Sequence, residues 1–166
     1  MKIVTFPDPI LREKMPDFDF ENPIMDPKEL ERKMLEIMFA NNAIGLAANQ
    51  VGVRARVFVM GDKQNFLLAK AYFNPKIVAN TEEIHDLEEG CLSFPGVFVN
   101  IKRPSKIRVE YQTSDGTVEQ SEFSDYDCKV FLHEFDHLEG ITFQDRVSAL
   151  KWALAVKKSK SKRKFK

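Results

Sequence analysis

Cysteines are scarce in this sequence, and long apolar runs are absent. Two cysteines among 166 residues, Cys91 and Cys128, are too few for a disulfide scaffold, so each is a candidate ligand, catalytic group or core side chain. No stretch approaches the roughly 18 apolar residues of a membrane span. The segment from Met1 to Pro7 lacks the apolar block of a secretory signal. We therefore expect a protein of the cell interior that does not enter a membrane.

The net charge of zero conceals an uneven distribution of basic residues. Residues 157–166 contain seven Lys or Arg and no acid, which leaves 18 basic and 25 acidic residues before them. A basic end of this kind is usually a solvated tail, and the alternative is an electrostatic contact with nucleic acid. The apolar content of 43% and the absence of internal repeats predict one catalytic domain over residues 1–150. Residues 151–166 would form the end of a helix and the basic tail.

Start and stop signals predict the helices, and short apolar runs predict the strands. Asp26 and Pro27 favour a helix that begins there and ends near Asn41. A second helix is expected from its cap, Ser124, to Gly140, which favours termination. A third helix would begin near Val147. The expected strands cover residues 56–60, 66–73, 76–78, 106–111 and 117–123, the last two joined as a hairpin through Ser114, Asp115 and Gly116.

The second helix carries the sequence His133-Glu134-Phe135-Asp136-His137 and is expected to lie at the centre of the fold. The elements predict an α+β fold in which mostly antiparallel strands pack around this helix. A separation of four residues places His133 and His137 about 40° apart on one helix face, where both can bind one divalent metal ion. Polar residues on a helix surface are the alternative interpretation. The pattern favours the metal site.

Glu134 lies between the two histidines and has a chemical role if a metal is bound. The metal lowers the pKa of a bound water towards about 7, and Glu134 can then take the proton as general base. A glutamate that only forms a salt bridge is the alternative. The motif therefore predicts a metal-dependent hydrolase that acts on a carbonyl compound.

The sequence after the motif does not supply a third ligand. One class of metalloproteases has a histidine six residues after the second histidine, and here that residue is Phe143, which cannot coordinate a metal. A downstream acidic ligand is also excluded, because the last acid, Asp145, follows His137 by only eight residues. The third ligand must come from upstream.

Three upstream residues are candidates. Cys128 lies about 140° around the helix axis from His133, which favours a core cysteine. His85 belongs to a polar, loop-like run in which a solvated histidine is expected. Cys91 lies in the run Glu-Gly-Cys-Leu-Ser at residues 89–93, where a divalent cation would stabilise its thiolate. For Cys91 alone, a core cysteine is an equal alternative.

Residues 43–52, Ala-Ile-Gly-Leu-Ala-Ala-Asn-Gln-Val-Gly, are rich in small side chains, and their spacing alone favours a tightly packed turn after the first helix. Taken together, the three segments resemble the peptide deformylase family, whose motifs have the forms G-φ-G-φ-A-A-x-Q, E-G-C-L-S and H-E-x-x-H, where φ is apolar. The motifs occur here in the same order. The resemblance extends from Phe6 to about Ser148 and thus covers nearly the whole chain.

The resemblance implies a reaction and the residues that carry it out. The family removes the formyl group from N-formylmethionine at the start of nascent chains and releases formate, through attack by a metal-bound water. Carried over by motif position, the metal ligands are Cys91, His133 and His137, the general base and acid is Glu134, and the oxyanion donors are Gln50 and the backbone N–H of Leu92.

Substrate contacts are expected on both sides of the metal. Backbone groups of Ile44 and Gly90 would pair with the substrate strand, and the absence of a side chain at Gly45 would allow its approach. Helix geometry suggests that the methionine pocket is lined by the residues seven, four and three positions before His133, namely Tyr126, Lys129 and Val130.

One divalent metal per chain is expected, but the ligands do not fix its identity. Cysteine and two histidines suit zinc, ferrous iron, nickel or cobalt. The resemblance favours ferrous iron in cells, with zinc or nickel in purified protein.

The resemblance also implies an N-formylmethionyl peptide as substrate. We expect a monomer, and residues 157–166 would contact ribosomal RNA. The expected location is the cytoplasm, an organelle matrix or stroma, or a host cytoplasm if a virus encodes the chain.

The chain departs from the family pattern at three positions, and two other functions compete. Ala43 replaces a usual glycine, Leu132 replaces a usual glutamine, and Lys129 is unusual near the pocket, but none removes a ligand or the base.

A metalloprotease and a structural metal site are the two competing functions. A metalloprotease would lack its third ligand. A structural metal site would need four protein ligands and would leave Glu134 and Gln50 without a role.

Overall fold

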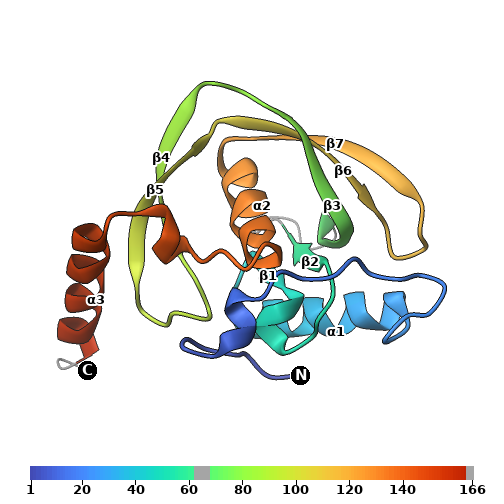
Figure 1. Ribbon diagram of the computed structural model, residues 1–166, viewed down its shortest axis with the longest axis horizontal. Coiled ribbons are helices and arrows are strands. Elements are labelled where there is room, and N and C mark those ends of the chain that lie inside the picture. Colours follow the sequence, from blue (N-terminus) through green and yellow to red (C-terminus); the bar gives the residue numbers. More distant parts are fainter. Residues whose placement is uncertain (62–67, 164–166) are drawn as a thin grey trace.

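The computed structural model describes residues 1–61 and 68–163 and has a mixed α+β fold (Figure 1). In this part of the chain the α-helices are α1 (Pro27–Ala40), α2 (Asp125–Leu138) and α3 (Ala149–Arg163). Short 3-10 helices are η1 (Pro9–Arg12), η2 (Ala48–Val51) and η4 (Phe143–Arg146). The strands are β1 (Gly45–Ala47), β2 (Val57–Met60), β3 (Lys70–Asn80), β4 (Ile84–Gly90), β5 (Phe98–Pro104), β6 (Lys106–Gln112) and β7 (Val118–Ser124).

Two antiparallel sheets surround α2. One has the strand order β1-β2-β3-β6-β7, and the other consists of β4 and β5. Figure 1 shows α2 in the middle of the molecule, with strands above it and on both sides, and α3 along the outside of β5. The predicted α+β class is confirmed. Among the described residues, no helix has the length and apolarity needed to cross a membrane.

Apolar side chains at helical spacing explain why α1 and α2 pack where they do. On α1, Leu30, Met34 and Met38 are fully buried and pack against the five-stranded sheet. On α2, Phe131 is fully buried, with its ring centroid 4.9 Å from that of Phe58 on β2. The second half of α2 is enclosed, so its polar residues His133, Glu134, Asp136 and His137 are also buried. Buried polar groups usually need partners.

Several predicted elements are confirmed. The Asp26 side chain accepts a hydrogen bond from Glu29 N–H and caps α1, which ends one residue before Asn41. The hairpin of β6 and β7 has the predicted strands and turn. Gly140 follows α2 with a φ of +70°, a left-handed conformation that favours glycine and ends the helix. The third helix begins at Ala149, two residues after its predicted start, and crosses the predicted boundary at residue 150.

The strand predictions were wrong in two regions. Residues 70–80 form one long strand instead of two, and Phe66 and Leu67 of the prediction lie outside the described residues. The run that contains His85 is not a loop but strand β4, and its partner β5 was not predicted. Charged side chains concealed β4, because one of its inward positions is occupied by a carboxylate, Glu89, that is buried and paired.

The prediction for residues 43–52 was also wrong. Residues 45–51 form strand β1 and the 3-10 helix η2 rather than only a turn after the first helix. Ser124 occupies the cap position of α2, as predicted, although its side chain makes no capping hydrogen bond. Asp125, the first residue of the helix, has a φ of +51°. Positions near a sharp backbone change depend on the whole fold and are not fixed by local sequence.

The ring of Phe131 joins α2 to the five-stranded sheet, and its removal should therefore destabilise the whole domain. We expect Phe131→Ala to lower the free energy of unfolding by about 3–5 kcal/mol, because it leaves a cavity among aromatic rings. Urea unfolding followed by circular dichroism measures this loss. Leu150→Ala is the control, because Leu150 is 72% exposed and should change stability little. Equal effects of the two substitutions would contradict this account of the core.

Candidate metal centre and its cavity

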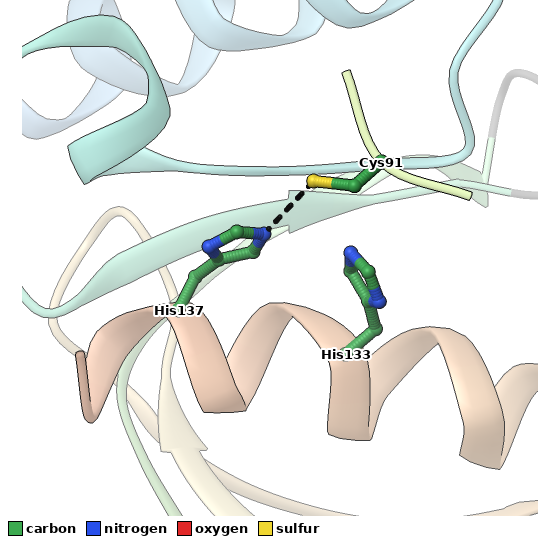
Figure 2. A group of neighbouring side chains, drawn as sticks. All are labelled: Cys91, His133 and His137. Atoms are coloured by element: carbon green, nitrogen blue, oxygen red, sulfur yellow. Dashed lines mark hydrogen bonds between the residues drawn. The ribbon is translucent and has the colours of Figure 1, made fainter. Parts of the chain in front are cut away.

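Cys91, His133 and His137 come together from two distant parts of the chain. Cys91 directly follows β4, and the two histidines lie on one face of α2 (Figure 2). One ligand atom from each lies within 4.8 Å of the others, and Cys91 Sγ is 3.3 Å from His137 Nε2. A thiolate and two imidazoles at such separations suit a tetrahedral ion with bonds of about 2.0–2.3 Å. The three side chains therefore fit a divalent metal.

Glu89 fixes the ring orientation of His133. Its Oε2 atom is 2.7 Å from His133 Nδ1, which leaves His133 Nε2 for a metal. Burial disfavours the charged form of His133, but its contacts with Cys91 and Glu89 outweigh this effect and raise its pKa. Burial lowers the pKa of His137. Metal binding needs a free lone pair on the nitrogen of each imidazole that faces the ion, so the metal would compete with protons at this site.

Glu89 is itself held by an arginine. Arg103 on β5 donates from Nε to Glu89 Oε1 at 2.6 Å and from Nη2 to Glu89 Oε2 at 3.0 Å. Burial would raise the pKa of Glu89, but the bonds from His133 and Arg103 outweigh burial and lower it to about 2. The carboxylate therefore stays ionised across the physiological range. Sequence reasoning missed Glu89 as a functional residue, although it lies two positions before Cys91 in the recognised motif.

Glu134 is buried beside the three ligand side chains. Burial raises its pKa to about 7, and its Oε2 atom has no hydrogen-bond partner. Gly45 makes room for it, because a Cβ atom at residue 45 would lie 2.7 Å from Glu134 Cγ and 2.8 Å from Cδ. The glycine was expected to allow the substrate to approach. The structure gives it another role, that of accommodating the carboxylate.

The amide of Gln50 points at the sulfur of Cys91. Gln50 Nε2 lies 3.3 Å from Cys91 Sγ and 3.1 Å from Ser93 Oγ, while Gln50 Oε1 accepts a bond from Ala47 N–H at 2.9 Å. The bond to Ala47 fixes which end of the amide is the oxygen. The N–H₂ end therefore faces the ligand cluster, where it can donate.

A cavity of about 820 Å³ opens beside the cluster. The predicted site residues line it, with the exception of His137, which lies deeper. The lining includes Ile44, Gly45, Gln50, Gly90, Cys91, Leu92, Tyr126, Lys129, Val130, His133 and Glu134. The Lys129 Nζ atom donates to the Glu88 carbonyl oxygen at 3.1 Å and lies 4.0 Å from the centroid of the Tyr126 ring.

The other two ligand candidates lie apart from the cluster. Cys128 is buried, and its Sγ contacts the Pro104 carbonyl at 3.2 Å. Its predicted place in the core is confirmed. His85 is partly exposed on β4 beside Asp125, with Nδ1 at 3.4 Å from Oδ1. Leu132, one of the departures from the family pattern, packs in the apolar cluster around α2 and so does not supply a polar contact to the metal site.

Comparison with known proteins gives a consistent result. The family model described as Polypeptide deformylase matches residues 1–152. Peptide deformylase from Thermotoga maritima is 42% identical over 158 residues, which cover 95% of this chain and 93% of that protein. The crystal structure of peptide deformylase from Thermotoga maritima superposes with a TM-score of 0.82 at 39% identity and covers 89% of this chain and 97% of that chain.

More distant relatives agree with this result. A chloroplastic peptide deformylase 1B of rice, Oryza sativa subsp. japonica, is 35% identical over 155 residues, which are 89% of this chain and 55% of the rice protein. A peptide deformylase from Synechococcus elongatus, solved in complex with actinonin, has a TM-score of 0.85 at 30% identity and covers 95% of this chain and 85% of that one.

The fold and the buried cluster of a thiol, two imidazoles and a carboxylate are those of a hydrolase with a candidate metal site. The chain belongs to the polypeptide deformylase family. Its activity is therefore removal of the N-formyl group from nascent polypeptides. Members of this family are metalloenzymes, which agrees with the candidate metal site.

The two cysteines allow a matched test of the metal site. We expect Cys91→Ala to lose tightly bound divalent metal, because two imidazoles alone do not complete the site. Cys128→Ala should retain about one metal ion per chain, because Cys128 lies in the core. Metal content of purified protein, measured by elemental analysis, separates the two outcomes. Full metal content in Cys91→Ala would refute Cys91 as a ligand.

Proposed function

We propose that formyl hydrolysis takes place at the cluster of Cys91, His133 and His137, with Glu134 as general base and acid. The observation that carries this proposal is Glu134, a buried carboxylate with an unpaired oxygen among the residues that line the 820 Å³ cavity. A divalent metal held by these three side chains would act as a Lewis acid and lower the pKa of a coordinated water.

Glu134 would move one proton through the reaction. Its pKa of about 7 allows the carboxylate to accept a proton from the attacking water near neutral pH and to return it to the leaving nitrogen. Burial keeps other water away from the carboxylate, and Gly45 leaves it the space that it needs. Formate and a free amino terminus are the products.

Gln50 and Leu92 would stabilise the negative charge that forms on the formyl oxygen. The Gln50 N–H₂ group already faces the cluster, 3.3 Å from Cys91 Sγ, and its orientation is fixed by the bond from Ala47. The backbone of Leu92 adjoins Cys91 and lines the same cavity. Preorganised donors at the position of a developing oxyanion typically lower the barrier by about 3–4 kcal/mol.

The substrate would lie as an extended strand between two strand edges. β1 is an edge strand of the large sheet, and within the described residues β4 pairs with β5 alone, so each has a backbone edge towards the cavity. Gly90 lies at the end of β4. The Ile44 carbonyl already accepts a bond from Gly61 N–H at 2.9 Å, so a substrate N–H would use its second lone pair. Tyr126, Lys129 and Val130 from α2 would receive the methionine side chain.

The finer properties of the enzyme are part of the same proposal. Ferrous iron is the expected metal in cells, with zinc or nickel in purified material, because the donor set accepts all three. We also propose a monomer with the division into residues 1–150 and 151–166, and a location in the cytoplasm or in an organelle. The similar plant proteins, peptide deformylases 1B of rice and tomato, are chloroplastic, which supports the organellar alternative.

Two substitutions test the role of Glu134 and its dependence on Gly45. We expect Glu134→Gln to retain metal and to reduce formate release from formyl-Met peptides by about 10²–10⁴-fold, because the proton carrier is lost. Gly45→Ala should reduce kcat with metal retained, because its methyl group displaces the carboxylate. Formate is measured under anaerobic conditions, and an unblocked peptide reports internal cleavage.

The double variant is the control for mechanism. If Gly45→Ala acts only through Glu134, adding it to Glu134→Gln should cause little further loss. A full additional loss would show that Gly45 acts on the substrate instead. Cleavage of the unblocked peptide, or no turnover by the metal-loaded wild type, would refute the proposed reaction.

The basic end of the chain would place the enzyme at the ribosome. α3 is exposed along one side, where Leu150 and Leu154 are 72% and 60% exposed, and residues 157–163 of the basic segment form its last turns. An enzyme that acts on nascent chains benefits from attraction to ribosomal RNA, which such a cluster of cations can supply.

Charge removal from α3 tests this contact. We expect replacement of Lys157, Lys158 and Lys160 by Gln to weaken co-sedimentation with ribosomes at low salt, with wild-type binding itself falling as salt rises. The matched control replaces three exposed lysines from other elements, Lys28, Lys76 and Lys102. Equal effects of the two triple variants would mean that total charge, and not α3, attracts the ribosome.

A further inference from the structure

Asp136, inside the motif but not a proposed ligand, binds two arginines, of which Arg103 is buried and Arg146 is not. Its Oδ2 atom accepts a bond from Arg103 Nη1 at 2.8 Å and one from Arg146 Nε at 2.9 Å, and its Oδ1 atom contacts Arg146 Nη2. Asp136 is 4% exposed. A carboxylate buried to this degree needs such partners, and both come from elements outside α2.

Arg103 uses its guanidinium to bridge two carboxylates that belong to different parts of the proposed metal site. Its Nε and Nη2 atoms bind Glu89, and its Nη1 atom binds Asp136. The side chains of Arg103, Glu89 and Asp136 are only 5%, 2% and 6% exposed. The planar guanidinium fixes the angle between its partners, which a lysine ammonium would not.

This bridge connects the strand that leads to one proposed ligand with the helix that carries the other two. Glu89 lies two residues before Cys91, at the end of β4, and also binds His133 Nδ1. Asp136 lies on α2 directly before His137. Within the described part of the chain, β4 has no strand partner in the large sheet. The position of Cys91 relative to α2 therefore depends on contacts such as the Arg103 bridge.

We infer that Arg103 is a positioning residue, which through Glu89 and Asp136 holds Cys91 and His133 in the arrangement that binds the metal. The inference rests on the proposed ligands. Arg146, whose side chain is 42% exposed, supports Asp136 from the outer side. Without Arg103, two buried carboxylates would lose their shared cation and would repel each other, and the His133 ring would lose its fixed partner.

Cobalt binding provides a test that does not depend on turnover. The chains compared are wild type, Arg103→Lys, Arg103→Met, Glu89→Gln and the control Lys102→Met, which changes an exposed neighbour on β5. For each folded chain, the Kd for Co²⁺ is measured by competition with a chelator, and the visible absorption of bound Co²⁺ reports coordination geometry. We expect Arg103→Met to bind Co²⁺ about 10–100-fold more weakly with an altered spectrum, and the control to match wild type.

The conservative variants keep the inference testable if Arg103→Met does not fold. Arg103→Lys retains the charge without the planar geometry, and Glu89→Gln retains the shape and an acceptor oxygen, so both should bind Co²⁺ more weakly than wild type but better than Arg103→Met. Folded Arg103→Lys and Glu89→Gln with wild-type Kd and spectrum would overturn the inference. Absence of Co²⁺ binding by wild type would instead refute the proposed metal site itself.

Discussion

The buried contact of Arg103 with Glu89 and Asp136 is the constraint on which the site depends. It connects the two-stranded sheet to α2, and these are the two parts of the chain that carry the proposed ligands. Ionic groups in a protein interior are costly unless each one is paired, and here each carboxylate has the arginine as partner. Because the pairing leaves little freedom, Cys91 is brought to within 3.3 Å of His137 without a covalent link between the segments.

Burial and local partners also set the pKa values of the carboxylates in the site. Burial raises the pKa of Glu134 to about 7, while the contacts of Glu89 with His133 and Arg103 lower the pKa of Glu89 to about 2. The difference follows from partners rather than depth, because Glu89 binds a cation and Glu134 does not. In the proposed mechanism the two carboxylates have different tasks, since Glu89 would orient the His133 ring and Glu134 would exchange protons.

Much of the fold could be predicted from local signals, and the failures have a common cause. Asp26 and Pro27 mark the start of α1, and the hairpin of β6 and β7 follows from its alternation and turn. β4 and β5 could not be predicted, because an inward position of β4 holds Glu89. A glutamate is expected on the surface, and its burial is explained only by the ion pair with Arg103, which the sequence does not reveal. The ligand role of Cys91 could be suggested from the family resemblance, but its spacing alone left a core cysteine equally plausible.

The sequence by itself determined what lies on one helix: His133 and His137 share a face, with Glu134 between them, because the helical repeat fixes the angles between residues a few positions apart. Tertiary structure decided everything that depends on distant segments meeting. It placed Cys91 and Gln50 beside α2, showed that Gly45 accommodates Glu134, and brought Arg103 between two carboxylates. Contacts of that kind arise from the packing of whole elements, for which a local pattern carries no information.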